Sequence, residues 1–220
     1  QHATDYIEKF LVAKFHPATI IIGYDHRFGK NREDNYQLLE KYRGPYHYQL
    51  IEIPEAVIKD NTISSTRIRK ALSHGEIAEA NDLLGYHYFF EGLVIQGNKL
   101  GRTIGYPTAN LLQSDVEKLV PGNGVYAVQV TLPSLPQFGT LNGMMNIGVR
   151  PTVDGTKRSI EVNIFDFNED IYDKPMRVQV VEHLRGEQKF DGLEALKHQL
   201  DQDEMHSRAI LKTLAIQQQG

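Results

Sequence analysis

The first 85 residues of the chain alternate between helix-like and strand-like patterns of apolar residues. An opening stretch with helical spacing is followed by Ala18–Tyr24, a short apolar run typical of a buried strand. A polar helical stretch around Asn35–Tyr42 precedes a second strand-like run, Tyr48–Ile53. Hydroxyls at Ser64–Thr66 are placed to cap a helix, and a further helix ends at Gly85, a residue type favoured just beyond helix C-termini. This alternation predicts βαβ units and a parallel sheet.

After Gly85 the pattern changes to short strands separated by Gly, Pro and Asn. Five or six strands without a strong helix among them predict a small antiparallel barrel or sandwich. The expected strands are YFFEGLVI, GVYAVQVTL, LNGMMNIGV, SIEVNIFDF and MRVQVVEHL. Leucine and isoleucine then recur on a polar frame from Leu193 to Leu214, which predicts a helix covering the barrel, with a break near Met205 left open. We therefore expect two domains, residues 1–85 and 86–220.

Composition narrows the class of protein. The chain has 220 residues, of which 40% are hydrophobic and 24% charged, as in a globular protein. It has no run of about 20 apolar residues, so we expect no membrane partner. The absence of cysteine excludes disulfides, thiolate metal sites and a cysteine nucleophile, and fits a cytoplasmic location. A formal net charge of −4 argues against a broad nucleic-acid-binding surface.

The start of the chain also carries information. It begins at Gln1 without methionine, on a helix-like segment, with no basic stretch followed by an apolar run. We therefore expect no secretory signal here and interpret the chain as part of a longer protein.

The richest candidate chemistry lies between Gly97 and Asn110, in the sequence GNKLGRTIGYPTAN. Glycines four residues apart allow backbone to approach a ligand closely, so this loop could present amides to phosphates, or it could be an ordinary barrel turn. Thr108 and Asn110 are two residues apart and would project from one side of an extended chain. Their oxygens suit Mg²⁺ with phosphate co-ligands, and the alternative is a polar turn bonded to its own backbone.

This segment resembles the riboflavin kinase family, in which the PTAN run is the most specific motif. The resemblance covers residues 86–216 and implies a kinase that uses Mg²⁺ and ATP to convert riboflavin to FMN. It implies that Thr108 and Asn110 contact the metal and the nucleotide, and that the preceding loop covers the phosphates. The implied nucleotide-binding residues are Gly97, Gly101, Arg102, Gly105, Tyr106, Thr108 and Asn110.

Further stretches carry the same resemblance. Asn146–Gly148 with Pro151–Thr152 matches one of them, and SIEVNIFDF matches another and implies that Glu161 is the catalytic base. Many relatives have His where this chain has Asn163, a departure from which we expect little consequence. The run Leu184–Asp191 resembles a loop that closes over the flavin, with Arg185 and Phe190 as implied contacts. Tyr126 and Phe165 could also stack on a flavin or belong to the core.

The upstream part resembles FMN adenylyltransferase, the other half of the bacterial bifunctional enzyme. GYDHRFG at Gly23–Gly29 is close to that family's GYDFRFG, with His26 where Phe is usual, and ISSTRIR at Ile63–Arg69 matches its phosphate-binding motif. The resemblance implies nucleotide contacts by Ser65, Thr66 and Arg67 at a helix start, where amides, dipole and cations converge. An ordinary capped helix is the alternative. No histidine stands in an H-x-G-H-like pair, so we expect this chain alone not to adenylylate FMN.

The expected architecture is therefore a partial Rossmann-like nucleotidyltransferase α/β segment, followed by a small antiparallel Greek-key β-barrel with a C-terminal helix. Two other functions stay open. A non-catalytic flavin or nucleotide carrier would need no base at Glu161, and an oligonucleotide-binding barrel would show more basic residues. The sequence leaves the oligomeric state open.

Overall fold

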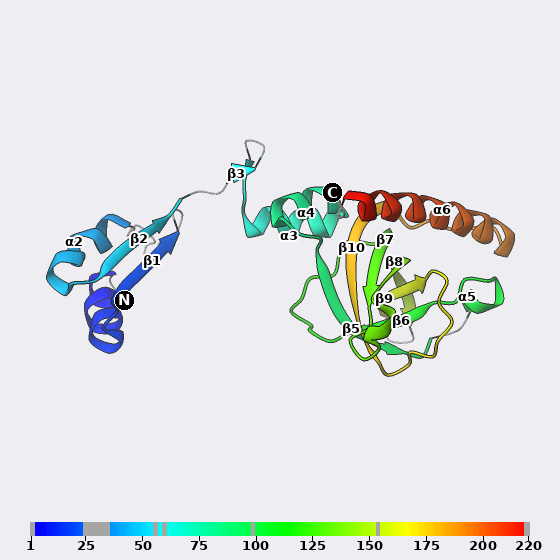
Figure 1. Cartoon of the computed structure of the whole chain (residues 1–220), viewed down its shortest axis with the longest axis horizontal. Coiled ribbons are helices and arrows are strands. Elements are labelled where there is room, and N and C mark those ends of the chain that lie inside the picture. The colour runs from blue at the N-terminus through cyan, green and yellow to red at the C-terminus, as the bar shows by residue number, and fades with distance from the viewer. Residues whose placement is uncertain are drawn as a thin grey trace. The chain divides into compact units, whose positions relative to one another are not determined.

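The computed structural model of the chain describes residues 3–23, 36–54, 57–58, 61–97, 100–152 and 155–217. The chain forms two compact units, residues 1–63 and 64–220 (Figure 1). We describe each unit separately.

The first unit is an α/β segment built on two parallel strands. Its strands β1 and β2 pair in parallel, with Thr19 opposite Gln49. Ile7, Ile22 and Leu39 are buried between the strands and the helices, so the predicted parallel pairing is confirmed. The elements are α1 (Ala3–Asp5), the π-helix η1 (Tyr6–Phe15), β1 (Thr19–Gly23), α2 (Tyr36–Tyr46), β2 (Gln49–Ile53) and the short antiparallel pair β3 (Val57–Ile58) and β4 (Asn61–Thr62).

Two helices, α3 (Ser65–His74) and α4 (Ile77–Leu84), belong to the second unit. Ser64 caps α3 by accepting the Arg67 amide at 3.2 Å, and Gly85 ends α4 at φ 74°, both as the sequence predicts. Asn81 of α4 donates to the Val180 carbonyl of the barrel at 3.1 Å and accepts the Tyr88 amide at 2.7 Å. Because these helices pack on the barrel, the second compact unit begins at Ser64. The domain boundary expected near Gly85 stays a prediction.

The second unit is a closed antiparallel barrel. Among the described residues its strands run in the order β10-β5-β6-β9-β8-β7, which departs from chain order as Greek-key connections require. Side chains alternate between a buried interior, with Met145 and Val162 among its members, and an outer face. The elements are β5 (Phe89–Ile95), α5 (Leu100–Thr103), β6 (Ala109–Gln113), β7 (Gly124–Thr131), the 3₁₀ turn η2 (Pro136–Phe138), β8 (Thr140–Thr152), β9 (Gly155–Ile164) and β10 (Pro175–Arg185).

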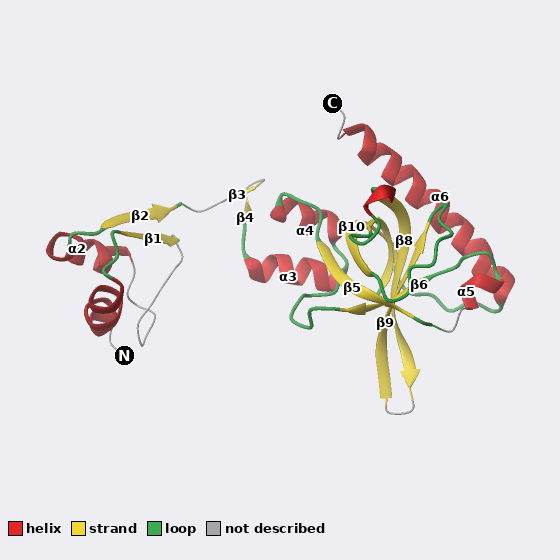
Figure 2. Cartoon of the chain, turned by 60° about the horizontal axis from the view of Figure 1, so that its bottom comes forward, coloured by secondary structure: helices red, strands yellow, loops and turns green. Residues whose placement is uncertain are grey.

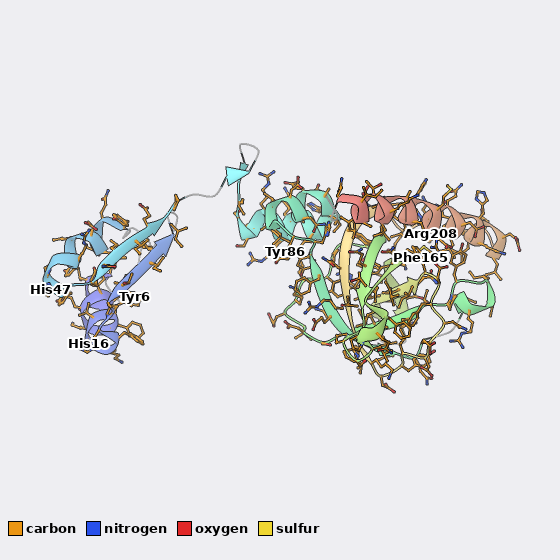
Figure 3. The ribbon with its side chains drawn as sticks, in the orientation of Figure 1. Tyr6, His16, His47, Tyr86, Phe165 and Arg208 are labelled. Atoms are coloured by element: carbon orange, nitrogen blue, oxygen red, sulfur yellow. The ribbon has the colours of Figure 1, made fainter. Side chains whose placement is uncertain are left out.

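A long C-terminal helix, α6 (Leu193–Gln217), lies along the outer face formed by β7, β8 and β10 (Figure 2). It continues through Met205, which is 61% exposed, so the break considered there is absent. Arg208 forms an ion pair with Asp166 at 2.8 Å and lies over the Phe165 ring at 4.5 Å (Figure 3). The helix thereby covers part of the barrel, as the sequence predicts.

Two tyrosines of the barrel interior make its stability sensitive to alkaline pH. Burial raises the pKa of Tyr88 and of Tyr126 to about 12 each, against about 10 in an unfolded chain. The contribution of the two protonated phenols to the free energy of unfolding is complete below pH 10. It falls as the pH rises towards 12, by up to about 1.4 kcal/mol per pH unit for each tyrosine. Urea unfolding at pH 9, 10 and 11 measures the slope. The Tyr88→Phe/Tyr126→Phe variant should flatten it, and an unchanged slope in that variant would contradict the assignment.

Candidate active site

Polar side chains from three adjacent strands form a row on the outer face of the barrel. In the strand register, Glu161 of β9 lies opposite Asn110 of β6 on one side and Asn146 of β8 on the other. Directly opposite residues project from the same face of a sheet. Their neighbours Leu111 and Val162 point into the interior, so this row faces outwards.

Thr108 joins this row from the residue just before β6. Its hydroxyl Oγ1 donates to Glu161 Oε2 at 3.2 Å, and both side chains are half-buried. Thr108 of the PTAN segment and Glu161 of the SIEVNIFDF strand are 53 residues apart in the sequence, and their side chains are in contact. Thr108, Asn110 and Glu161 all line one cavity.

The cavity has a volume of about 320 Å³ and three kinds of wall. The barrel contributes its polar row, whereas the flap (Gly97 and residues 100–106) and α6 contribute mainly apolar side chains. The loop after β10 closes the remaining side. The residues that line this first cavity include Gly101, Ile104, Tyr106, Thr108, Asn110, Asn146, Glu161, Asn163, Arg185, Glu187, Phe190, Leu196 and Leu200.

Glycines let the flap pack against the motif that it precedes. A side chain at Gly97 would collide with the Asn110 amide, and one at Gly101 would collide with the Tyr106 carbonyl oxygen. The Gly101 carbonyl accepts the Tyr106 amide at 2.8 Å. Gly105 has φ 88°, a conformation in which glycine is favoured. The glycine spacing seen in the sequence therefore serves this close packing.

Tyr106 connects the flap to α6. Its hydroxyl donates to Asp201 at 2.5 Å, and the ring is 8% exposed among apolar side chains. Burial, reinforced by the hydrogen bond to Asp201, raises the pKa of Tyr106 well above its ordinary value. Tyr106 is thus a neutral donor that links two walls of the cavity.

Arg185 and Phe190 both border the cavity. The Arg185 guanidinium makes a two-pronged ion pair with Asp203 of α6, with Nε–Oδ1 at 2.9 Å and Nη2–Oδ2 at 2.7 Å. Asp203 is 2% exposed, and Gln199 also donates to it at 2.9 Å. The guanidinium lies 5.7 Å from the centre of the Phe190 ring. The charge of Arg185 is therefore largely balanced within the protein.

A second cavity, of about 430 Å³, lies on the other side of Thr108. Arg102 of the flap lines this cavity together with Thr108 and the aromatic residues Phe167 and Tyr172. Arg102 does not line the first cavity, so the predicted flap residues divide between two hollows. Thr108 borders both.

The upstream candidates lie at the start of α3. Ser65, Thr66 and Arg67 occupy its first turn, as predicted. The Arg67 guanidinium pairs with Glu79 of α4, with Nη2–Oε1 at 2.6 Å. This contact holds α3 to α4. Most of the GYDHRFG sequence, from residue 24 to 29, lies outside the described residues.

Sequence reasoning did not single out several residues that shape the first cavity. Asn146 was quoted within a matching stretch, and its place opposite Glu161 follows from strand register alone. Asp201 and Asp203 carry no local signal, because aspartates on a polar helix usually face solvent.

Tyr126 and Phe165 are 0% and 6% exposed and belong to the core clusters. Within the described part of the chain, no group of three or more His, Asp or Glu side chains could hold a metal by itself.

A closed barrel with a PTAN strand, a facing glutamate and a glycine-rich flap defines a class of small-molecule kinase. The riboflavin kinase family model matches residues 84–211, and the FAD synthetase family model matches residues 1–67. The chain belongs to the riboflavin kinase family.

Curated relatives extend this similarity over nearly the whole chain. Proteins named bifunctional riboflavin kinase/FMN adenylyltransferase are 38% identical in Haemophilus influenzae, 40% in Buchnera aphidicola and 38% in Listeria monocytogenes. The matches cover 97%, 91% and 95% of this chain. The chain spans 68%, 63% and 65% of the length of these relatives.

A solved structure from Streptococcus pneumoniae, titled a macrolide-efflux protein, has the same fold with a TM-score of 0.82 and 36% identity. The match covers 94% of this chain and 65% of that one. Among the helices that the structure describes here, none combines the length and apolarity needed to cross a bilayer.

Proposed function

We propose that this chain transfers the γ-phosphoryl group of ATP to the ribityl 5′-hydroxyl of riboflavin, giving FMN and ADP. One observation carries the proposal: Thr108, which donates to Glu161, lines both cavities. A kinase must bring two substrates together at one point, with a carboxylate beside the acceptor. The family match and the names of the relatives support riboflavin as the acceptor.

The position of Glu161 assigns a substrate to each cavity. Glu161 lines only the first cavity, whose flap and helix walls carry Ile104, Leu196 and Leu200, so this hollow suits a flat, largely apolar flavin ring. The second cavity is lined by Arg102, by the rings of Phe167 and Tyr172 and by the carboxylates of Glu169 and Asp170. Arg102 and the rings suit phosphates and a purine, and the carboxylates would require a cation bound with the phosphates. Thr108 stands between them, where the phosphoryl group crosses.

In the transfer step, a Glu161 oxygen accepts the proton of the 5′-hydroxyl. The hydroxyl oxygen forms a bond to the γ-phosphorus while the bond from that phosphorus to the β,γ-bridging oxygen breaks, and ADP leaves. Flap amides and Arg102 would offset the developing negative charge. The walls formed by the flap and α6 would exclude water, the competing acceptor.

The donor set fits Mg²⁺ bound together with the nucleotide. Thr108, which lines both cavities, and Asn110, which lines the first, offer neutral oxygen ligands near the Glu161 carboxylate, and Mg²⁺ takes its remaining ligands from phosphates and water. Bound there, the ion would neutralise phosphate charge and polarise the γ-phosphoryl group. We place this chemistry in the cytoplasm, where ATP is available, with no nucleic acid or membrane as partner.

The FAD synthetase match over residues 1–67 leads us to assign the α/β segment to the FMN-adenylylating part of such a bifunctional enzyme. In this assignment Ser65, Thr66 and Arg67 approach the nucleotide phosphates at the start of α3.

The direct test is FMN formation from riboflavin and Mg-ATP, followed by chromatography with fluorescence detection. Stoichiometric FMN and ADP are expected. Riboflavin binding without FMN formation would instead indicate a non-catalytic flavin carrier. Binding of single-stranded oligonucleotides with no flavin turnover would overturn both.

Replacing Arg102 by Ala should raise the KM for ATP about tenfold and leave the KM for riboflavin unchanged. The reason is that Arg102 lines only the cavity assigned to the nucleotide, and a charge-assisted phosphate contact contributes about 1.4 kcal/mol or more. Steady-state kinetics with each substrate varied in turn gives the two constants. Arg177→Ala, which removes an exposed arginine that pairs with Glu91 and lines neither cavity, is the control. A rise in the riboflavin KM alone would reverse the assignment of the cavities.

A further inference from the structure

The pairing between β6 and β9 ends inside the PTAN motif, at Ala109. The last pair in the register is Ala109 opposite Val162, so Pro107 and Thr108 lie beyond the ladder. Beyond this pair, a side chain of β9 donates the next hydrogen bond to the motif in place of a backbone amide. Asn163 Nδ2 donates to the Pro107 carbonyl oxygen at 2.7 Å, and Asn163 is 7% exposed.

Asn163 and Glu161 project from the same face of β9, because they are two residues apart on one strand. Two neighbouring side chains of β9 thus hold two consecutive residues of the motif. Asn163 holds the Pro107 carbonyl at 2.7 Å, and Glu161 accepts the Thr108 hydroxyl at 3.2 Å. The shorter contact comes from the residue with no part in proton transfer.

On its other side, the motif is continuous with the flap. The flap residue before Pro107 has one internal contact, between the Tyr106 amide and the Gly101 carbonyl, and one to α6, between the Tyr106 hydroxyl and Asp201. Gly105, at φ 88°, stands two residues before Pro107. The Asn163 contact ties the Pro107 carbonyl directly to β9. Without it, the backbone at Pro107 would lose this hydrogen bond, and Thr108 would be held to β9 through its hydroxyl and the ladder from Ala109 onwards.

We propose that Asn163 is a positioning residue for phosphoryl transfer: its amide extends the β6–β9 ladder to Pro107 and so fixes Thr108 against Glu161. The inference rests on the proposed kinase function. A displacement of about 1 Å at a reacting centre can lower a rate by about 10²-fold. The residue acts through Thr108 and Glu161, so turnover is the quantity it controls.

Two substitutions remove the donor in different ways. Asn163→Asp keeps the shape but turns an oxygen towards the Pro107 carbonyl, and Asn163→Leu keeps a similar volume without charge. Both should lower kcat about 10- to 100-fold, with both KM values changed less than threefold. Asn163→His should restore much of the rate, because imidazole Nδ1 is as many bonds from the backbone as the asparagine amide nitrogen and can donate a hydrogen bond.

Asn81→Asp is the matched control. The Asn81 amide also donates to barrel carbonyl oxygens, those of Val180 and Val181, on strand β10 away from both cavities. It should lower the melting temperature but leave kcat unchanged. A structural role for Asn163 alone would make the two Asp variants behave alike.

The mechanism is tested by a double-variant cycle and by hydrogen exchange. If Asn163 acts through Glu161, Asn163→Leu should cost less than threefold in a Glu161→Gln background. Amide exchange in residues 100–108 should accelerate in Asn163→Asp and not in Asn81→Asp, whether or not the chain turns over riboflavin. No FMN from the unchanged chain would refute the proposed function. FMN formation with full activity in Asn163→Leu would refute this inference alone.

Discussion

Replacing Glu161 by Gln is expected to lower the rate of FMN formation by about 10²- to 10⁴-fold while ATP binding survives. Gln keeps the size of the side chain and can still accept the Thr108 hydroxyl, but it cannot take a proton from the 5′-hydroxyl. A general base in reach of its proton typically contributes a factor of this size. Because Glu161 does not line the second cavity, nucleotide affinity should change little. Single-turnover kinetics and ATP titration by calorimetry measure the two effects.

The first cavity contains a second carboxylate that makes this experiment decisive. Glu187 also lines it and accepts the Asn123 amide at 3.0 Å, whereas Glu161 accepts the Thr108 hydroxyl of the PTAN segment. Unchanged turnover in Glu161→Gln together with a large loss in Glu187→Gln would move the base to Glu187. Glu91→Gln, an exposed carboxylate paired with Arg177 on the barrel surface, controls for loss of charge. Equal losses in Glu161→Gln and Glu91→Gln would point to electrostatics of the whole chain.

Local patterns were enough to predict the sheet types and most of the elements, although β6 and α5 were not among those expected. Strand β1 lies within the apolar run that begins at Ala18, Ser64 caps the start of α3, and Gly85 ends α4 as expected. Alternation along SIEVNIFDF gave the facing of Glu161 relative to Ile160 and Val162. Such features depend on a few neighbouring residues, and these leave a clear trace in the sequence.

Features set by packing over long distances were not visible in the sequence. The placement of α3 and α4 with the barrel depends on Asn81, whose partners lie about 100 residues away. The continuity of α6 through Met205 depends on Asp203, Ser207 and Leu211, which are buried at intervals of one helical turn. The burial of Asp203 and Ser207 cannot be recognised from the sequence, because they are polar residues. The sequence therefore did not exclude a break in the helix near Met205.

The same limit applies to the site. The resemblance to the riboflavin kinase family brought Thr108, Asn110 and Glu161 together as candidates, and the structure places all three on one cavity. Arg102 lines the other cavity, and this could not be predicted because it depends on the path of the flap in space. The departure at Asn163 was expected to matter little because Asn163 is not the expected base, yet its amide donates to the Pro107 carbonyl of the segment that contacts Glu161.

Replacing Asp203 by Leu should destabilise the barrel unit by about 3 kcal/mol and weaken riboflavin binding more than ATP binding. Asp203 is 2% exposed and its partner Arg185 only 15%, so the change leaves a largely buried guanidinium without its counter-charge. Breaking such a pair from one side costs about 3–5 kcal/mol. Leu196 and Leu200 of α6 line the cavity assigned to the flavin, so loosening the helix should affect that substrate first. Urea unfolding followed by circular dichroism, and flavin fluorescence titration, measure the two effects.

Two further variants separate the buried charge from a general weakening of α6. Asp166→Asn breaks a similar ion pair between Arg208 and the end of β9, but the Asp166 side chain is 79% exposed, so unfolding should change little. Asn also tolerates the φ of 55° at this position. Replacing both Asp203 and Arg185 by Leu and Met should recover stability, because no unpaired charge remains. If the double variant recovered stability but not riboflavin affinity, Arg185 would contact the flavin directly. If Asp203→Leu were as stable as the unchanged chain, the ion pair would have no part in holding α6 against the barrel.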